Sequence, residues 1–175
     1  NVIFEGNVKL GDKVQIKSNT IIKNAVISSG TEVKPYTIIE DSLVGKNCNI
    51  GPFARIRPNC TLEESVGIGN FVEVKASNIK KNTKANHLTY LGDSDIGENV
   101  NVGAGVITCN YDGVNKHKTV IKDNVFIGSD SQLIAPIIVE EGVTIAAGST
   151  ITDNSEKDSL LIARSRQQEK KNWKR

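Results

Sequence analysis

His87 is the side chain in this sequence best suited to move a proton at neutral pH. It is one of two histidines, and it lies in the polar stretch ANHLTYLGD at residues 85–93. An imidazole with a pKa of about 6.5 serves as a general base when it is held near an acidic proton. A histidine in a polar run is also compatible with a solvated turn residue, so both interpretations stand at this point.

Arg57 and Lys75 are the cations whose spacing suggests a binding site. They are 18 residues apart, which is the length of three six-residue units. If the chain winds three such units into each coil, the two side chains stack on one edge. Arginine contributes a planar two-pronged donor and lysine a point charge, and this combination suits a phosphate group. Taken singly, each cation reads as a solvated surface residue.

The elements that would position these residues are predicted by a six-residue apolar period. Leu, Ile or Val recurs at steps of six residues, with occasional steps of five, from Leu10 to Ile151. Outside one interruption, only Ala85 and Thr108 depart from these residue types. The position four residues further on is usually small or β-branched, as at Thr20. An amphipathic helix is excluded, because its apolar stripe recurs every three to four residues.

Short strands joined by tight turns fit this period instead. Three units close one coil, and coils must stack because a single coil cannot bury its apolar face alone. We therefore predict an all-β fold, a parallel β-helix. Residues 109–120, CNYDGVNKHKTV, interrupt the period and are predicted to form an inserted loop. The predicted domains are the β-helix at residues 1–151 and a C-terminal loop and basic arm at residues 152–175.

Composition narrows the classes of function. The 175 residues suit one domain, and the net charge of +2 predicts neither a nucleic-acid nor a membrane partner. Three cysteines without a CxxC spacing argue against a disulfide framework or a zinc site and favour a reducing, cytoplasmic location. The sequence contains no Met, which predicts that it is part of a longer protein.

Several motifs follow one another along the chain and together carry a family resemblance. They are GPFARIRP at 51–58, GNFVEVK at 69–75, HLTYLGD at 87–93, IGENVNVGAGVITCNYDG at 96–113 and FIGSDSQLIAP at 126–136. In this order they resemble the C-terminal acetyltransferase domain of the bifunctional N-acetylglucosamine-1-phosphate uridyltransferase/glucosamine-1-phosphate N-acetyltransferase family, a hexapeptide-repeat family. The resemblance covers essentially the whole chain. It implies a left-handed coil, although parallel crossovers are normally right-handed.

The resemblance also implies an activity. Acetyl would pass from the co-substrate acetyl-CoA to the 2-amino group of glucosamine-1-phosphate. The product would serve the synthesis of UDP-N-acetylglucosamine, peptidoglycan and lipopolysaccharide in the cytoplasm. The expected assembly is a homotrimer with sites shared between subunits. This domain would need no metal, and Mg²⁺ would belong to a uridyltransferase domain expected before the first residue.

The resemblance assigns roles residue by residue. His87 would be the catalytic base and Glu73 its orienting carboxylate, although Glu73 alone reads as an exposed coil residue. The expected sugar-phosphate ligands are Arg57, Lys75, Tyr90, Asn101 and Asn110. The expected acetyl-CoA ligands are Ala104, Asn110, Tyr111, Lys116, Ser129, Ala147 and Arg164. Two positions depart from the family pattern: Asn86 replaces the usual Gly, and the tail reads RSRQ from Arg164 in place of an arginine-valine-proline-like segment.

Two alternatives use the same fold. A γ-type carbonic anhydrase also carries this repeat, but it needs three histidines around zinc, and this sequence has two. A non-enzymatic solenoid would explain the repeat without explaining the stacked cations, the polar insertion and the basic arm. Release of thiol from acetyl-CoA in the presence of glucosamine-1-phosphate discriminates between these alternatives.

Overall fold

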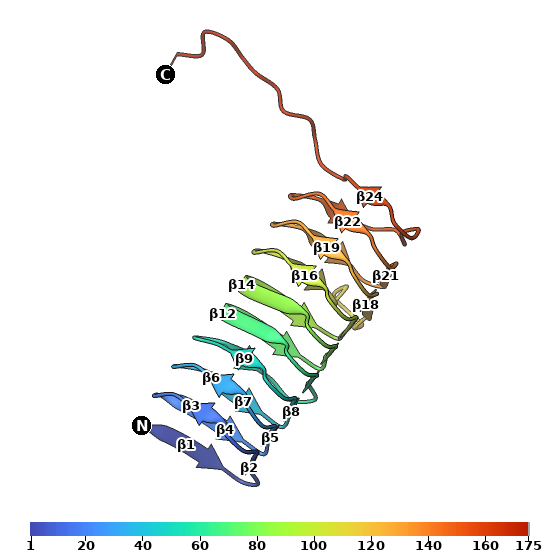
Figure 1. Ribbon diagram of the computed structural model, residues 1–175. Coiled ribbons are helices and arrows are strands. Elements are labelled where there is room, and N and C mark those ends of the chain that lie inside the picture. The colour runs from blue at the N-terminus through green and yellow to red at the C-terminus, as the bar shows by residue number, and fades with distance from the viewer. Residues whose placement is uncertain (175) are drawn as a thin grey trace.

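Short strands wind into a stack of parallel coils (Figure 1) in the computed structural model, which describes residues 1–174. The solenoid has about 9 turns, and none of these residues forms a helix. The all-β parallel β-helix predicted from the six-residue period is confirmed, with the left-handed coil that the resemblance implies. Within residues 1–174 there is accordingly no helix long and apolar enough to cross a membrane.

Each coil contributes a strand to three faces, which we number in chain order. The first face contains β1 (Val2–Glu5), β4 (Thr20–Lys23), β7 (Ile38–Glu40), β10 (Arg55–Ile56), the C-terminal parts of β12 (Gly67–Lys75) and β14 (Lys84–Gly92), β17 (Ile107–Cys109), β20 (Gln132–Ile134) and β23 (Thr150–Ile151). The second face contains β2 (Lys9–Leu10), β5 (Val26–Ile27), β8 (Leu43–Val44), β11 (Thr61–Leu62), β13 (Asn78–Ile79), β15 (Ser94–Ile96), β18 (Thr119–Ile121) and β21 (Ile137–Val139). The third face contains β3 (Gln15–Ile16), β6 (Glu32–Val33), β9 (Asn49–Ile50), the N-terminal parts of β12 and β14, β16 (Asn101–Val102), β19 (Phe126–Ile127), β22 (Thr144–Ile145) and β24 (Leu160–Leu161).

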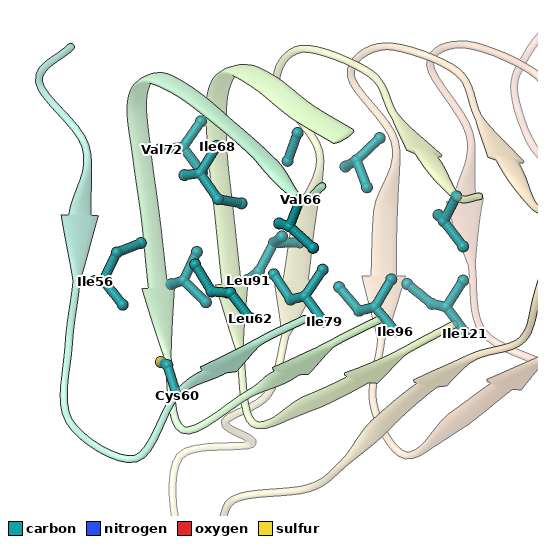
Figure 2. Packing of buried hydrophobic residues seen from close by; sticks show 14 of the residues in the cluster. Ile56, Cys60, Leu62, Val66, Ile68, Val72, Ile79, Leu91, Ile96 and Ile121 are labelled. Atoms are coloured by element: carbon teal, nitrogen blue, oxygen red, sulfur yellow. The ribbon is translucent and has the colours of Figure 1, made fainter. Parts of the chain in front are cut away.

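The interior is filled by the residues of the six-residue period. Figure 2 shows Leu62, Ile79, Ile96 and Ile121 in one row, each contributed by the second-face strand of a successive coil. Every member of this row is at most 1% exposed. Burial of such a side chain stabilises the fold by about 1.5–3 kcal/mol. The stacked rows therefore hold successive coils together, along with the backbone hydrogen bonds between their parallel strands.

The two exceptions to the apolar period also point inward. Ala85 and Thr108 are both 0% exposed. The Thr108 hydroxyl accepts a hydrogen bond from the Gly92 N–H at 2.8 Å, so its polar atom is satisfied inside the coil. Leu10 differs, because it lies on the first coil and is 44% exposed.

The corner between the third and first faces, which we call the 3–1 corner, repeats one backbone conformation. It runs through Asn19, Tyr36, Phe53, Phe71, Leu88, Gly105, Asp130 and Gly148, which all have φ between 47° and 78°. A left-handed backbone costs an L-residue roughly 1–2 kcal/mol. Aromatic stacking offsets this cost on the early coils, where ring centroids are 4.9 Å apart for Tyr36 and Phe53 and 5.3 Å apart for Phe53 and Phe71.

Two segments lie outside the regular coils. Residues 110–118 connect β17 to β18, where the insertion was expected, and an antiparallel bridge between Tyr111 and Lys116 closes this loop. The β-helix itself continues past the expected boundary at Ile151, because β24 pairs with β22 and extends the third face. Residues 164–174 contain neither strand nor helix and run away from the last coil (Figure 1). Arg175, the last residue of the expected basic arm, lies outside the described residues.

Candidate functional site

His87 lies exposed at the 3–1 corner, in the middle of β14. The coil below places Asn70 of β12 in register with it. The two side chains are joined by a hydrogen bond of 2.9 Å between His87 Nδ1 and Asn70 Oδ1. The imidazole is therefore held at one ring nitrogen while the rest of the ring faces solvent.

A close approach of two corners creates this pair. A Cβ added to Gly69 would lie 1.8 Å from the backbone oxygen of Asn86, so only glycine fits at that position. The approach sets Asn70 directly beside His87. Asn86, the departure from the resembled family, is not among the residues with a positive φ. The corner therefore tolerates Asn86 without backbone strain.

Small residues continue the 3–1 corner above His87. Ala104, Ser129 and Ala147 each precede the left-handed residue of their coil, as His87 precedes Leu88. Backbone hydrogen bonds tie these coils together: Gly105 N–H to Leu88 O (2.9 Å), Asp130 N–H to Ala104 O (2.8 Å) and Gly148 N–H to Ser129 O (2.8 Å). At the end of the row, Arg164 Cδ lies 3.7 Å from where a Cβ of Gly148 would stand. We call the row Ala104, Ser129, Ala147 and Arg164 the corner column.

A second group of polar side chains lies on the first face, near its junction with the second. Lys75 Nζ lies 3.0 Å from Asp93 Oδ2, and the Asn110 amide donates a hydrogen bond to the same carboxylate. Burial opposes ionisation of Asp93, but the hydrogen bonds from Lys75 and Asn110 outweigh it and lower its pKa. The positive charge of Lys116, on the insertion, acts in the same direction. The insertion thus places Asn110 and Lys116 near the ion pair of Lys75 and Asp93.

Arg57 occupies the position below Lys75 on the same face. Its Nη1 lies 2.7 Å from Glu73 Oε1, and this hydrogen bond raises the pKa of the guanidinium. Tyr90 is in register with Glu73 on the next coil. The 18-residue spacing therefore does bring Arg57 and Lys75 to neighbouring positions of successive coils, but each cation is already paired with a carboxylate.

The residues expected to bind the sugar phosphate do not all lie on one face of the β-helix. Arg57, Lys75 and Tyr90 lie on the first face, whereas Asn101 lies on the third face, in β16. Glu73 bonds Arg57, and His87 bonds Asn70, so the expected pair of Glu73 and His87 is not formed within one chain. Sequence reasoning missed Asn70 and Asp93. Asn70 lies in the motif GNFVEVK and Asp93 in the motif HLTYLGD. Which side chains they contact on the neighbouring coil depends on the number of residues in that coil.

The insertion is a closed hairpin with its own charge pair. The Asp112 carboxylate accepts hydrogen bonds from the backbone N–H groups of Asn115 (2.6 Å) and Val114 (2.8 Å). It also pairs with His117 Nε2 at 2.6 Å. The bond from Asn115, with those from His117 and Val114, lowers the pKa of Asp112 to about 2. These contacts hold Tyr111 and Lys116 on one hairpin.

A groove on the third face adjoins His87. Its volume is about 420 Å³, and its charged lining residues are Lys34 and Lys84. Asn70, Asn86 and His87 form the end of the groove at the corner. Among residues 1–174, no three His, Cys, Asp or Glu side chains are grouped so as to hold a metal ion.

Two family profiles match parts of the chain. The profile of the GMPPB C-terminal domain matches residues 1–82. The profile of the bacterial transferase hexapeptide, which describes six repeats, matches residues 118–153. The chain therefore carries transferase-type hexapeptide repeats, in agreement with the period that its sequence predicts.

Solved structures share the fold. They include the UDP-N-acetylglucosamine acyltransferase from Campylobacter jejuni, with a TM-score of 0.69 and 17% identity over 93% of this chain and 69% of that chain. The enzyme of the same name from Bacteroides fragilis 9343 has a TM-score of 0.62 and 14% identity over 91% of this chain and 68% of that chain. The enzyme from Francisella novicida has a TM-score of 0.59 and 19% identity over 86% of this chain. This chain spans 60% of the Francisella protein's length.

These likenesses define the class of architecture, which is the hexapeptide-repeat β-helix. At such low identities they show a shared fold, and the chemistry must be argued from the site itself.

Proposed function

We propose that this chain is an acetyltransferase that moves acetyl from acetyl-CoA to the 2-amino group of glucosamine-1-phosphate. The observation that carries the proposal is the position of His87 at the foot of the corner column. The small side chains of Ala104, Ser129 and Ala147 leave the backbone open to a narrow pantetheine arm. Arg164, at the far end, is suited to the phosphates of CoA.

The chemistry needs a base and a site for negative charge. The amine nitrogen attacks the thioester carbonyl carbon, and His87 accepts the proton that leaves the nitrogen. The C–S bond then breaks, and the sulfur leaves as the CoA thiol once it is protonated. Backbone N–H groups along the corner column are suited to holding the oxyanion of the tetrahedral intermediate. Direct transfer of this kind requires no metal.

The first-face cations are suited to the sugar phosphate. Arg57 and Lys75 offer a two-pronged donor and a point charge on successive coils, and Tyr90 adds a hydroxyl. Their carboxylate partners, Glu73 and Asp93, keep both cations oriented before a phosphate arrives. On the third face, Asn101 would bind the sugar. On the insertion, Asn110 would contact both substrates, and Tyr111 and Lys116 would bind acetyl-CoA.

We further propose a homotrimer whose sites are shared between subunits. Within one chain the first-face cations and Asn101 lie on different faces, so a neighbouring chain is needed to bring both groups to one substrate. The lower part of the 3–1 corner supports this assembly, because Tyr36, Phe53, Phe71 and Leu88 are 52%, 46%, 56% and 61% exposed. Such a contiguous apolar edge marks an interaction surface.

A thiol-release assay tests the proposed function. The chain is mixed with acetyl-CoA and either glucosamine-1-phosphate or glucosamine, and free thiol is measured with time. We expect rapid release with glucosamine-1-phosphate and slow release with glucosamine, because glucosamine lacks the phosphate that Arg57 and Lys75 would bind. Equal background release with both sugars would favour the non-enzymatic solenoid. The product would enter the synthesis of UDP-N-acetylglucosamine.

A further inference from the structure

We propose that Asn70 is a positioning residue that fixes the tautomer of His87, so that Nε2 is the nitrogen that accepts the proton. The inference rests on the proposed function, since it deepens the role given there to His87. Its basis is the 2.9 Å contact between Asn70 Oδ1 and His87 Nδ1. A carbonyl oxygen only accepts hydrogen bonds, so Nδ1 must carry the hydrogen and Nε2 keeps its lone pair.

The surroundings of the pair leave Asn70 as the orienting group. The third-face groove that ends at His87 has two charged lining residues, Lys34 and Lys84, and both are cations. The described lining of this groove contains no carboxylate that could accept the Nδ1 hydrogen. Glu73, the acid expected to orient the ring, is bonded to Arg57 on the first face. A neutral amide therefore takes the place that a carboxylate occupies in an acid–histidine pair.

The fold holds Asn70 firmly on both sides. Gly69, before it, lies against the backbone oxygen of Asn86, where a Cβ would be only 1.8 Å away. Phe71, after it, donates its N–H to Phe53 O at 3.1 Å and stacks on the Phe53 ring. Asn70 thus projects from a rigid corner toward His87. A hydrogen-bond partner fixed in this way determines which ring nitrogen of His87 is free.

The test reads the tautomer directly, by long-range ¹H–¹⁵N NMR on protein labelled at histidine nitrogen. The chain has two histidines, so His117 serves as an internal reference. In the parent protein we expect neutral His87 to carry its hydrogen on Nδ1. In Asn70→Ala we expect the hydrogen to shift largely to Nε2, while the His117 signals stay unchanged. Asn49→Ala is the matched control, because Asn49 lies in the same groove and Asn70 remains beside His87.

Kinetics provide the second readout. Asn70→Ala should lower kcat by about tenfold and leave the KM of both substrates near the parent values. Asn70→Asp keeps the acceptor and adds a negative charge close to the ring. This variant should keep the hydrogen on Nδ1 and move the acid limb of the pH–rate profile to higher pH.

Two results would overturn the inference. One is an Asn70→Ala protein whose neutral His87 still carries its hydrogen on Nδ1. The other is an Asn70→Ala protein with the altered tautomer but the parent kcat, since the tautomer would then not matter. The NMR measurement needs no turnover. Failure of the proposed acetyltransferase activity would therefore be seen separately, as an absence of thiol release in the parent protein.

Discussion

Arg57 and Glu73 form an ion pair across neighbouring coils of the first face, with Nη1 2.7 Å from Oε1. Both side chains remain more than a third exposed, at 38% and 37%. Such a pair contributes little to stability, typically about 0–1 kcal/mol. Its value lies in orientation, because the guanidinium is already directed along the face that also carries Lys75.

Replacement of either first-face cation should chiefly weaken the binding of the sugar phosphate. Hydrogen bonds to charged groups are worth about 1.5–3 kcal/mol. Arg57→Ala and Lys75→Ala should therefore each raise the KM for glucosamine-1-phosphate by about tenfold to a hundredfold and leave that for acetyl-CoA nearly unchanged. Steady-state kinetics with each substrate varied in turn measure both constants.

Arg55 is the control for this prediction. It lies on β10, two residues before Arg57, which follows the strand, and its guanidinium is 3.6 Å from Glu40. Arg55→Ala removes the same charge two residues away and should leave the KM for glucosamine-1-phosphate unchanged. If Arg57→Ala behaved like Arg55→Ala, the first face would not be the phosphate site.

Mixing two variants that both have low activity at low glucosamine-1-phosphate tests whether sites are shared between subunits. Each His87→Ala chain keeps Arg57, and each Arg57→Ala chain keeps His87. If a site takes these residues from neighbouring chains, about one quarter of the sites in randomly mixed trimers regain both. Activity should then reappear after joint unfolding and refolding.

The mixing experiment needs proof that mixed trimers form, from light scattering and from differently tagged chains purified together. Recovery of no activity in such trimers would mean that both residues act within one chain. A fully active monomer would refute the trimer as well.

The fold could be predicted from the sequence because its signal is redundant. Every coil repeats the same inward positions, so single departures such as Ala85 and Thr108 do not obscure the period. The residue at which the β-helix ends was harder to predict from the sequence. β24 adds Leu160 and Leu161 to the third face only after an irregular stretch from Thr152 to Ser159, where the period is lost.

The partners of outward side chains were harder to predict. The spacing of 18 residues predicted that Arg57 and Lys75 lie on successive coils, but the next coil is shorter, and Asn70 and His87 are paired at a spacing of 17. The six-residue period does not predict which carboxylate forms an ion pair with each cation. The choice of Asn70 over Glu73 beside His87 depends on the close approach at Gly69, which appears only in three dimensions.

Gly69 should be far less tolerant of substitution than Gly67 on the same strand. In Gly69→Ala the new Cβ would lie 1.8 Å from Asn86 O, whereas in Gly67→Ala the nearest atom would be 3.5 Å away. Overpacking costs typically 1–3 kcal/mol, so the Tm of Gly69→Ala should fall by about 3–10 °C. Differential scanning calorimetry gives the comparison. Equal Tm values for the two variants would show that the corners are not in close contact.

The hairpin of the insertion should depend on Asp112 at low pH. Its pKa in the folded protein is lowered from 3.8 to about 2, first by the hydrogen bond from Asn115. A lowered pKa means that the ionised carboxylate supports the hairpin above about pH 4, and that this support is lost as the pH falls through about 2. A ¹³C NMR titration of the carboxyl group should have its midpoint near pH 2. A midpoint near pH 4 would contradict the hairpin contacts.

The kcat of His87→Ala tests most directly whether His87 is the general base of acetyl transfer. Thiol release is measured for the parent and the variant at saturating acetyl-CoA and glucosamine-1-phosphate, with circular dichroism to show that both are folded. We expect kcat to fall about a hundredfold or more, which is the contribution of a general base. A folded His87→Ala protein that turns over at near the parent rate would contradict it.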